Sequence, residues 1–167
     1  LRHPYEGARA AFDSIVHHPA TLARSRDFTK RRRGMQIGII GLGKMGGNMA
    51  RRLARGGVRV TGYDPSPGAV AALAAEGIAE GAASLAALAT ALAPPRVFWM
   101  MVPAGDATES TFEALCGLAA PGDLVVDGGN AFYKDSQRRA GAAAARGIEF
   151  VDCAVSGSQK GFMLPAG

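Results

Sequence analysis

The chain has 167 residues, of which 48% are hydrophobic, and its formal net charge is +5. This length is sufficient for one domain with a proper core, and the composition is typical of a globular rather than a disordered protein. No apolar run approaches the roughly 20 residues that span a bilayer, and the amino-terminal residues lack the apolar core of a signal peptide. The sequence therefore predicts a cytoplasmic protein with no membrane partner.

Residues 1–34 form a basic arm that carries a net charge of +5 and all three histidines. Acidic and basic residues balance in residues 35–167, so the main domain shows no electrostatic sign of nucleic-acid binding. Basic segments without apolar periodicity are typical of solvated extensions, although an anionic surface is an alternative partner. A mitochondrial presequence is also Arg-rich, but Glu6, Asp13 and Asp27 argue against one. We expect a disordered arm that the fold does not need.

Short apolar strands alternate with helical segments along residues 35–157. This alternation indicates βαβ units, a parallel sheet with helices on both faces, and therefore a doubly wound Rossmann-type α/β fold. A turn is expected at "DPSPG", residues 64–68, where the prolines stop the preceding strand. The predicted strands are 36–40, 58–63, a short edge strand near Ile78, 96–101, 123–127 and 148–154. The predicted helices begin at Lys44 and then cover 69–76, 83–92, 108–118 and 134–147.

The stretch "MQIGIIGLGKMGGNMA", residues 35–50, contains the spacing G-x-G-x-x-G between the first predicted strand and the first helix. The first glycine allows a tight turn, the second lets the backbone approach a pyrophosphate, and the third allows close packing of helix on strand. The helix amino terminus adds N–H groups and a positive dipole end for the phosphates. Close packing without a ligand is the alternative. The predicted cofactor-binding residues of this loop are Gly41, Leu42, Gly43, Lys44, Met45 and Gly46.

Asp64 ends the second predicted strand, 18 residues after Gly46. A carboxylate at this position accepts hydrogen bonds from the adenosine ribose hydroxyls, and its charge opposes a 2′-phosphate. Pro65, Ser66 and Pro67 follow, where sites for the phosphorylated cofactor usually place an arginine. The sequence therefore predicts NAD, with NADP disfavoured. Asp64 can also form an Asx turn before the proline, and the two roles are compatible.

Three loops follow strands at the carboxyl edge of the predicted sheet, where Rossmann-type folds bind their ligands. They are "MVPAG" (101–105), "DGGN" (127–130) and "VSGS" (155–158). Asn130 provides both a donor and an acceptor, and Ser156 provides a hydroxyl. Any one loop is explained equally well as a tight turn, but three on one edge favour a site. Cys116 and Cys153 lack the spacing of a zinc site and are predicted to be small buried hydrophobes, so no metal is expected.

Four segments in this order, "GLGKMGGNMARRL", "VFWMMVPAG", "LVVDGGNAFYKDSQRR" and "GIEFVDCAVSG", resemble the amino-terminal half of 6-phosphogluconate dehydrogenase, decarboxylating. The resemblance covers about 35–157 and, without an arginine after Asp64, is to the NAD-preferring branch. It implies oxidative decarboxylation of 6-phosphogluconate to ribulose 5-phosphate in the pentose phosphate pathway, within a homo-oligomer. It also implies cofactor contacts from Met101, Val102, Pro103, Ala104 and Asn130, and sugar-acid contacts from Asn130, Ser156 and Gly157.

Residues 158–167 depart from the family, since Ser158 stands where a glycine is expected. The family's helical domain, with its catalytic lysine and glutamate, is expected to be missing, so no catalytic residue is assigned. Lys44, Lys134 and Lys160 do not match the catalytic position, and we expect the chain alone to be inactive. Two alternatives remain open. One is a dinucleotide-binding module without chemistry. The other is an enzyme like 3-hydroxyisobutyrate dehydrogenase, although that family usually carries a serine–threonine loop where "GGN" stands here.

Overall fold

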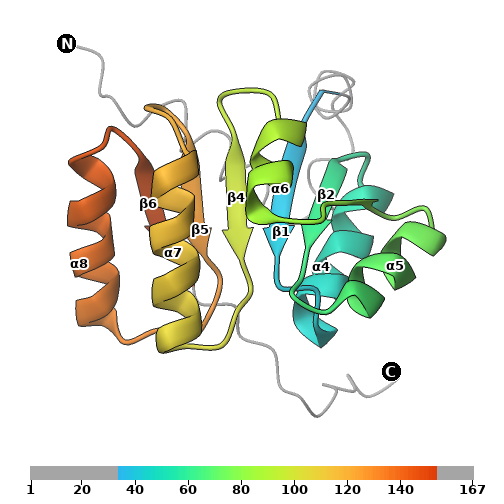
Figure 1. The fold of residues 1–167 in the computed structure, drawn as a ribbon, viewed down its shortest axis with the longest axis horizontal. Coiled ribbons are helices and arrows are strands. Elements are labelled where there is room, and N and C mark those ends of the chain that lie inside the picture. The colour runs from blue at the N-terminus through green and yellow to red at the C-terminus, as the bar shows by residue number, and fades with distance from the viewer. Residues whose placement is uncertain (1–33, 154–167) are drawn as a thin grey trace, which may run out of the picture.

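The structure, a computed structural model, describes residues 34–153. Its six strands form one parallel sheet in the order β3-β2-β1-β4-β5-β6 (Figure 1). The first strand, β1, lies in the middle of the sheet; β2 and β3 follow outward on one side, and the chain then crosses back to β4, β5 and β6 on the other. The Rossmann-type fold is thus confirmed. The strands are β1 (Gln36–Ile40), β2 (Arg59–Tyr63), β3 (Glu80–Gly81), β4 (Val97–Met100), β5 (Leu124–Asp127) and β6 (Glu149–Asp152).

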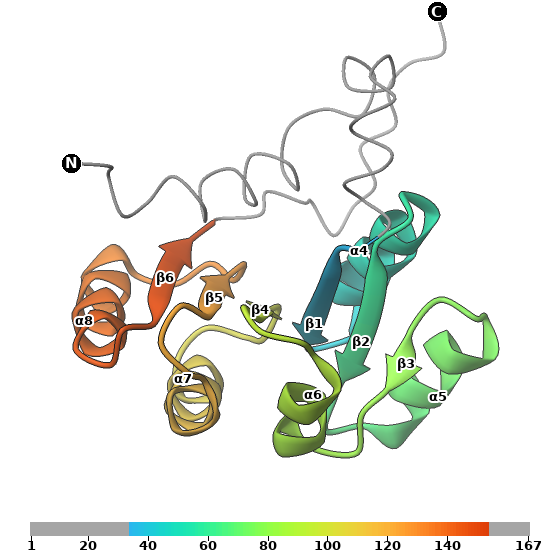
Figure 2. The same cartoon turned by 90° about the horizontal axis from the view of Figure 1, so that it is seen from above.

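Helices connect the strands and cover both faces of the sheet. Seen along the sheet, α4 lies on one face, while α6 and α7 lie on the opposite face (Figure 2). The helices are α4 (Lys44–Arg55), α5 (Pro67–Ala75), α6 (Leu85–Ala91), α7 (Asp106–Leu118) and α8 (Tyr133–Ala144). Residues 1–33 of the predicted arm, Ser156, Gly157 and residues 158–167 lie outside the described residues.

Two apolar layers hold the helices on the sheet, because successive strand residues point to opposite faces. In β4, Phe98 packs in the layer that contains Leu88 of α6 and Leu115 of α7. Its neighbour Trp99 packs in the other layer, with Ala50 of α4. Strands buried on both faces read as continuous apolar runs, which explains "QIGII" and "LVV" in the sequence.

The observed elements differ from the prediction mainly at their ends. The helix expected from residue 69 begins at Pro67, because proline has no N–H to lose and a suitable φ in the first helical turn. The edge strand expected near Ile78 is the two-residue β3, paired with Thr61 and Gly62 of β2. The last helix ends at Ala144 rather than 147, and Gly147 then takes a positive φ of 71°.

Candidate cofactor site at the carboxyl edge of the sheet

Two glycines of the G-x-G-x-x-G segment are required by packing, Gly41 in the loop after β1 and Gly46 in the first turn of α4. Gly41 has φ +89°, and a Cβ there would lie 2.5 Å from the carbonyl oxygen of Met101. A Cβ on Gly46 would overlap the carbonyl oxygen of Gly41. The absence of a side chain at Gly41 allows the tight turn, and its absence at Gly46 lets α4 pack close to β1, as expected for the first and third positions.

Gly43 is different, because no contact among residues 34–153 requires it to be a glycine. Its φ is −59°, and no atom lies within 4 Å of a Cβ built there. The residue is exposed at the amino terminus of α4 and, as the N-cap residue, offers no side chain to cap the helix. The missing side chain leaves the backbone open at the positive end of the helix dipole, an arrangement that suits an anion.

Asp64 connects the end of β2 to this loop. Its Oδ2 accepts a hydrogen bond of 2.7 Å from the backbone N–H of Leu42, and its Oδ1 accepts one of 2.8 Å from Ser66. The second bond is the Asx turn expected of Asp64 before Pro65. A carboxylate has about four lone-pair sites, so each oxygen keeps the capacity to accept another donor.

The loop 101–105 lies directly beside the glycine loop. The N–H of Met101 donates to the carbonyl of Ile40 at 2.7 Å, and its Sδ accepts from Nε1 of Trp99 at 3.2 Å. Further along, the hydroxyl of the buried Thr108 donates to the carbonyl of Pro103 at 2.8 Å. These bonds tie the loop to β1 at one end and to α7 at the other.

The loop 127–130 follows β5 and packs against the loop 101–105. The N–H of Gly128 donates to the carbonyl of Met100 at 2.9 Å, and a Cβ there would collide with Trp99 and come within 2.6 Å of the Sδ of Met101. Asn130 is exposed at the end of the loop. Since β2, β1, β4 and β5 are neighbours, the carboxyl edge brings Asp64, the glycine loop and both other loops together. Ligand binding by these residues stays a prediction.

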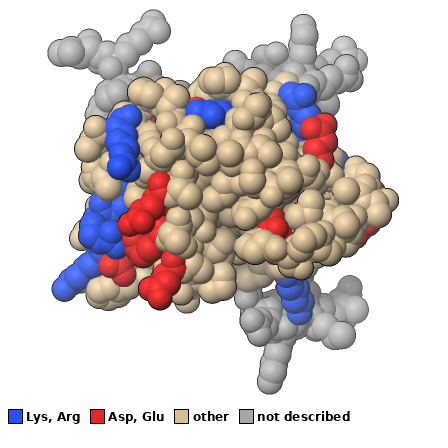
Figure 3. Space-filling model, viewed as in Figure 1, with Lys and Arg blue, Asp and Glu red and all other residues tan. Residues whose placement is uncertain are grey.

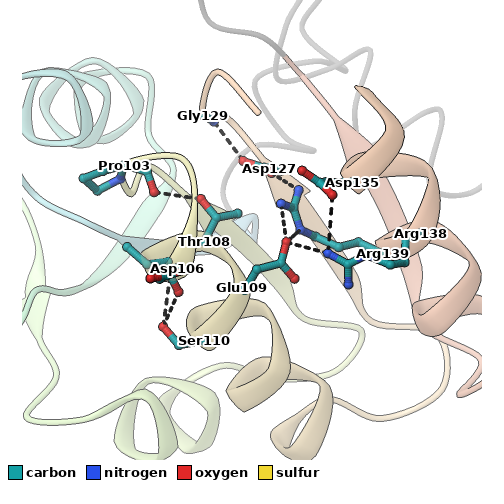
Figure 4. Close-up of polar contacts among 11 residues, drawn as sticks. Pro103, Asp106, Thr108, Glu109, Ser110, Asp127, Gly129, Asp135, Arg138 and Arg139 are labelled. Atoms are coloured by element: carbon teal, nitrogen blue, oxygen red, sulfur yellow. Dashed lines mark hydrogen bonds and ion pairs between the residues drawn. The ribbon is translucent and has the colours of Figure 1, made fainter. Parts of the chain in front are cut away.

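A buried charge cluster at this edge was not predicted. Arg139 of α8 is 1% exposed, and its Nη1 donates to Oδ2 of the fully buried Asp127 at 3.0 Å (Figure 4). Its Nε and Nη2 both donate to Oε1 of Glu109, at 2.9 and 2.6 Å. Arg138 completes the cluster by an ion pair of 2.8 Å with Glu109. Acidic and basic side chains accordingly lie side by side over α7 and α8 (Figure 3).

The pKa values of the two acids of this cluster, Asp127 and Glu109, are shifted in opposite directions. Burial raises the pKa of Asp127, against the hydrogen bond from Gly129 and the charge of Arg139. Burial also opposes ionisation of Glu109, but hydrogen bonds from Arg139 and Arg138 outweigh it, and the pKa of Glu109 lies below its ordinary value. Ser136, Arg139 and Ala143 share one face of α8 and are buried, but they are a polar, a charged and a small residue, so their spacing alone did not predict a buried face.

A second buried pair lies at the other end of β5. Asp123 is fully buried just before the strand and accepts from Nε of Arg96 at 2.8 Å. The backbone N–H groups of Ala120 and Arg96 also donate to it, at 2.8 and 2.7 Å. Burial would raise the pKa of Asp123, but these donors outweigh it and hold that pKa below the ordinary value.

The chemistry available within residues 34–153 is limited. This range contains no histidine, and its two lysines are Lys44 at the start of α4 and Lys134 in the first turn of α8. Across the same residues, no grouping of His, Cys, Asp or Glu could hold a metal ion. Nor does this part of the chain contain a helix long and apolar enough to cross a membrane.

Comparison with known proteins agrees with this geometry. Residues 36–163 match the model of a family described as the NAD binding domain of 6-phosphogluconate dehydrogenase. The NAD(+)-dependent, decarboxylating 6-phosphogluconate dehydrogenase of Haloferax volcanii is 43% identical over 130 residues. That alignment covers 78% of this chain and 42% of the relative, so the chain spans about two fifths of the curated protein.

Solved structures show the same fold in two kinds of enzyme. The 3-hydroxyisobutyrate dehydrogenase of Salmonella typhimurium superposes with a TM-score of 0.66 at 31% identity, over 74% of this chain and 43% of that one. The 6-phosphogluconate dehydrogenase of Plasmodium falciparum, studied in complex with NADP+ and with 6-phosphogluconate, gives a TM-score of 0.64 at 25% identity. That alignment covers 69% of this chain and 26% of the Plasmodium falciparum enzyme.

Proposed function

The chain belongs to the family of the NAD-binding domain of 6-phosphogluconate dehydrogenase, and we propose that it is the cofactor-binding part of such an enzyme. The proposed reaction is the oxidative decarboxylation of 6-phosphogluconate to ribulose 5-phosphate with a nicotinamide dinucleotide. One observation carries the proposal most directly. The glycine loop leaves an open backbone at Gly43 while Asp64 holds the same loop through Leu42.

The residues at the carboxyl edge fit a dinucleotide. Gly43 and the amino terminus of α4 would receive the pyrophosphate, and Asp64 would accept from the adenosine ribose. From there the ligand would run along the edge toward Met101, Val102, Pro103, Ala104 and Asn130. When bound, the cofactor supplies the acceptor for the hydride. The chain's own part is to fix its position and orientation.

NAD is the cofactor that we propose over NADP. The carboxylate of Asp64 would lie near a 2′-phosphate and repel it, and the three residues that follow, Pro65, Ser66 and Pro67, carry no positive charge. The related enzymes include one described as NAD(+)-dependent and one studied with NADP+, so the family alone does not select the cofactor.

Asn130, Ser156 and Gly157 would hold the sugar acid, of which Asn130 alone lies among the described residues. The proton transfers of the reaction would fall to groups outside residues 34–153. This part of the chain has no histidine, and its two lysines, Lys44 at the start of α4 and Lys134 in the first turn of α8, do not match the family's catalytic position. In this proposal the chain provides positioning, and a further domain in a homo-oligomeric protein provides the acid and base.

A second candidate is the oxidation of a 3-hydroxyacid, which the structural likeness to 3-hydroxyisobutyrate dehydrogenase favours. The loop "DGGN" supports the first candidate instead, because the resemblance assigns Asn130 to the sugar acid. A non-catalytic dinucleotide-binding module remains the third reading.

Titration calorimetry and a substrate screen separate these functions. The purified chain is titrated with NAD+ and NADP+, and then with 6-phosphogluconate and 3-hydroxyisobutyrate in the presence of saturating NAD+. Binding of NAD+ followed by binding of 6-phosphogluconate supports the proposal. Binding of 3-hydroxyisobutyrate alone favours the second candidate, and binding of cofactor without either acid favours the third. A chain that binds no dinucleotide contradicts all three.

A further inference from the structure

The side chain of Arg139 joins the two elements that carry the loops of the proposed site. Its Nη1 donates to Asp127, the last residue of β5, at 3.0 Å. Its Nε and Nη2 donate to Glu109, in the first turn of α7, at 2.9 and 2.6 Å. The guanidinium itself is buried, and its bond to Asp127 forms away from water, where charge-assisted hydrogen bonds are strong, while its bonds to Glu109 are partly exposed.

Each acid extends the connection to one loop. On the β5 side, Oδ1 of Asp127 accepts from the N–H of Gly129 at 3.0 Å, one residue before Asn130. On the α7 side, Thr108 precedes Glu109 and donates to the carbonyl of Pro103 at 2.8 Å. Figure 4 shows the series of hydrogen bonds that runs from one loop to the other, with Thr108 and Glu109 joined as neighbours in the chain. In order along that series, the residues are Pro103, Thr108, Glu109, Arg139, Asp127 and Gly129.

We propose that Arg139 is a positioning residue, which fixes the loop 101–105 relative to the loop 127–130 and thereby orients the nicotinamide half of the cofactor. The inference rests on the proposed function. Asp64 places the adenosine half at the end of β2, so the nicotinamide half extends toward the ends of β4 and β5, where these loops lie. Arg139 touches no ligand itself. Its planar fork of donors can serve two carboxylates at once, which a lysine cannot reproduce.

The competing explanation is that the cluster only stabilises the fold. The pair of Arg96 and Asp123 offers a matched control, because it has the same chemistry at the amino end of the same strand. That end lies opposite the loops. Loss of either arginine leaves a buried aspartate without its partner and should lower stability. Only loss of Arg139 should disturb the loops.

The experiment compares two ligands on the purified 167-residue chain. ADP contains the adenosine and pyrophosphate that Asp64 and the glycine loop would hold, whereas NAD+ also reaches the loops. Calorimetry is performed well below each variant's melting temperature. For Arg139→Met we expect the Kd of NAD+ to rise about tenfold while that of ADP changes by less than about twofold. For Arg96→Met we expect the ratio of the two Kd values to stay as in the unaltered chain.

Two further variants keep the test decisive. Arg139→Lys should recover only part of the NAD+ affinity, because a single ammonium lacks the planar fork of donors that meets the two acids from separate nitrogens. Glu109→Ala removes the partly exposed end of the bridge and should show the same selective loss if Arg139→Met does not fold. Equal loss of both ligands, or no loss in any variant of the bridge, overturns the inference while the proposed function stands. Failure of the unaltered chain to bind NAD+ and ADP overturns the proposed function and this inference with it.

Discussion

The carboxylate of Asp64 accepts a hydrogen bond from the backbone N–H of Leu42 at 2.7 Å. The group that we assign to the adenosine ribose therefore also fixes the glycine loop that would bind the pyrophosphate. A substitution at Asp64 acts on both parts of the site through one side chain.

Asp64→Ala should weaken NAD+ binding about tenfold or more, because a hydrogen bond to a charged group contributes about 1.5–3 kcal/mol. NADP+ should lose less affinity, or gain some, since the charge that opposes its 2′-phosphate is removed. Calorimetry with both cofactors measures the change, and Glu80→Ala serves as a control at an exposed acid on the neighbouring strand. Equal affinity of the unaltered chain for NAD+ and NADP+ would contradict this prediction.

Gly43→Ala and Gly46→Ala should separate ligand binding from packing. The space around Gly43 is open and its φ is negative, so alanine there should change stability by less than about 0.5 kcal/mol. Its methyl group would occupy the expected pyrophosphate position and weaken NAD+ binding about tenfold. Alanine at Gly46 meets the carbonyl of Gly41 and should cost about 1–3 kcal/mol of stability. Urea unfolding measures the stability of both variants, and calorimetry measures their NAD+ affinity. An unchanged NAD+ affinity in Gly43→Ala would contradict the assignment of Gly43 to the pyrophosphate.

Stability should fall in acid because of Glu109 and Asp123. Burial raises each pKa, but hydrogen bonds from arginines dominate and both values lie below the ordinary carboxyl range. Groups with depressed pKa values contribute stability above their unfolded-state pKa of about 4 and lose it as the pH falls through the folded value. Asp127 acts in the opposite sense, since burial raises its pKa, and its contribution is lost as the pH rises through that value.

Urea unfolding from pH 7 to pH 2 measures the balance of these groups. We expect the free energy of unfolding to decrease below about pH 4, where the two depressed carboxyls take up protons. Asp123→Asn should be less stable at pH 7 and should lose less stability on acidification. If Asp123→Asn loses as much free energy of unfolding on acidification as the unaltered chain, Asp123 does not contribute to the acid sensitivity.

The 167-residue chain should bind NAD+ without oxidising 6-phosphogluconate. General acid–base catalysis contributes about 10²–10⁴ in rate, and residues 34–153 offer no histidine and no lysine at the position that the resemblance assigns to catalysis. Calorimetry with NAD+ is paired with a fluorescence assay for NADH formation. Turnover by the verified chain would mean that a group such as Lys160 acts as the base.

Much of the fold could be predicted from the sequence, because apolar strands buried on both faces and the glycine spacing are local patterns. The packing roles of Gly41 and Gly46 followed from the same pattern, and so did the turn at Asp64. The connection from Arg139 to Asp127 and Glu109 could not be predicted. "KDSQRR" looks like a solvated helix surface, and only the tertiary arrangement of α7, α8 and β5 shows that one of its arginines is buried.

Trp99 is the only tryptophan of the chain, and its indole N–H contacts the sulfur of Met101 at the start of the loop that is proposed to hold the cofactor. The protein thus carries an intrinsic optical reporter next to its candidate site. Reduced nicotinamide absorbs where tryptophan emits, so energy transfer from this single donor would report occupancy without any label. Because one indole gives the whole signal, its quenching by NADH would measure proximity to the loop rather than an average over the molecule.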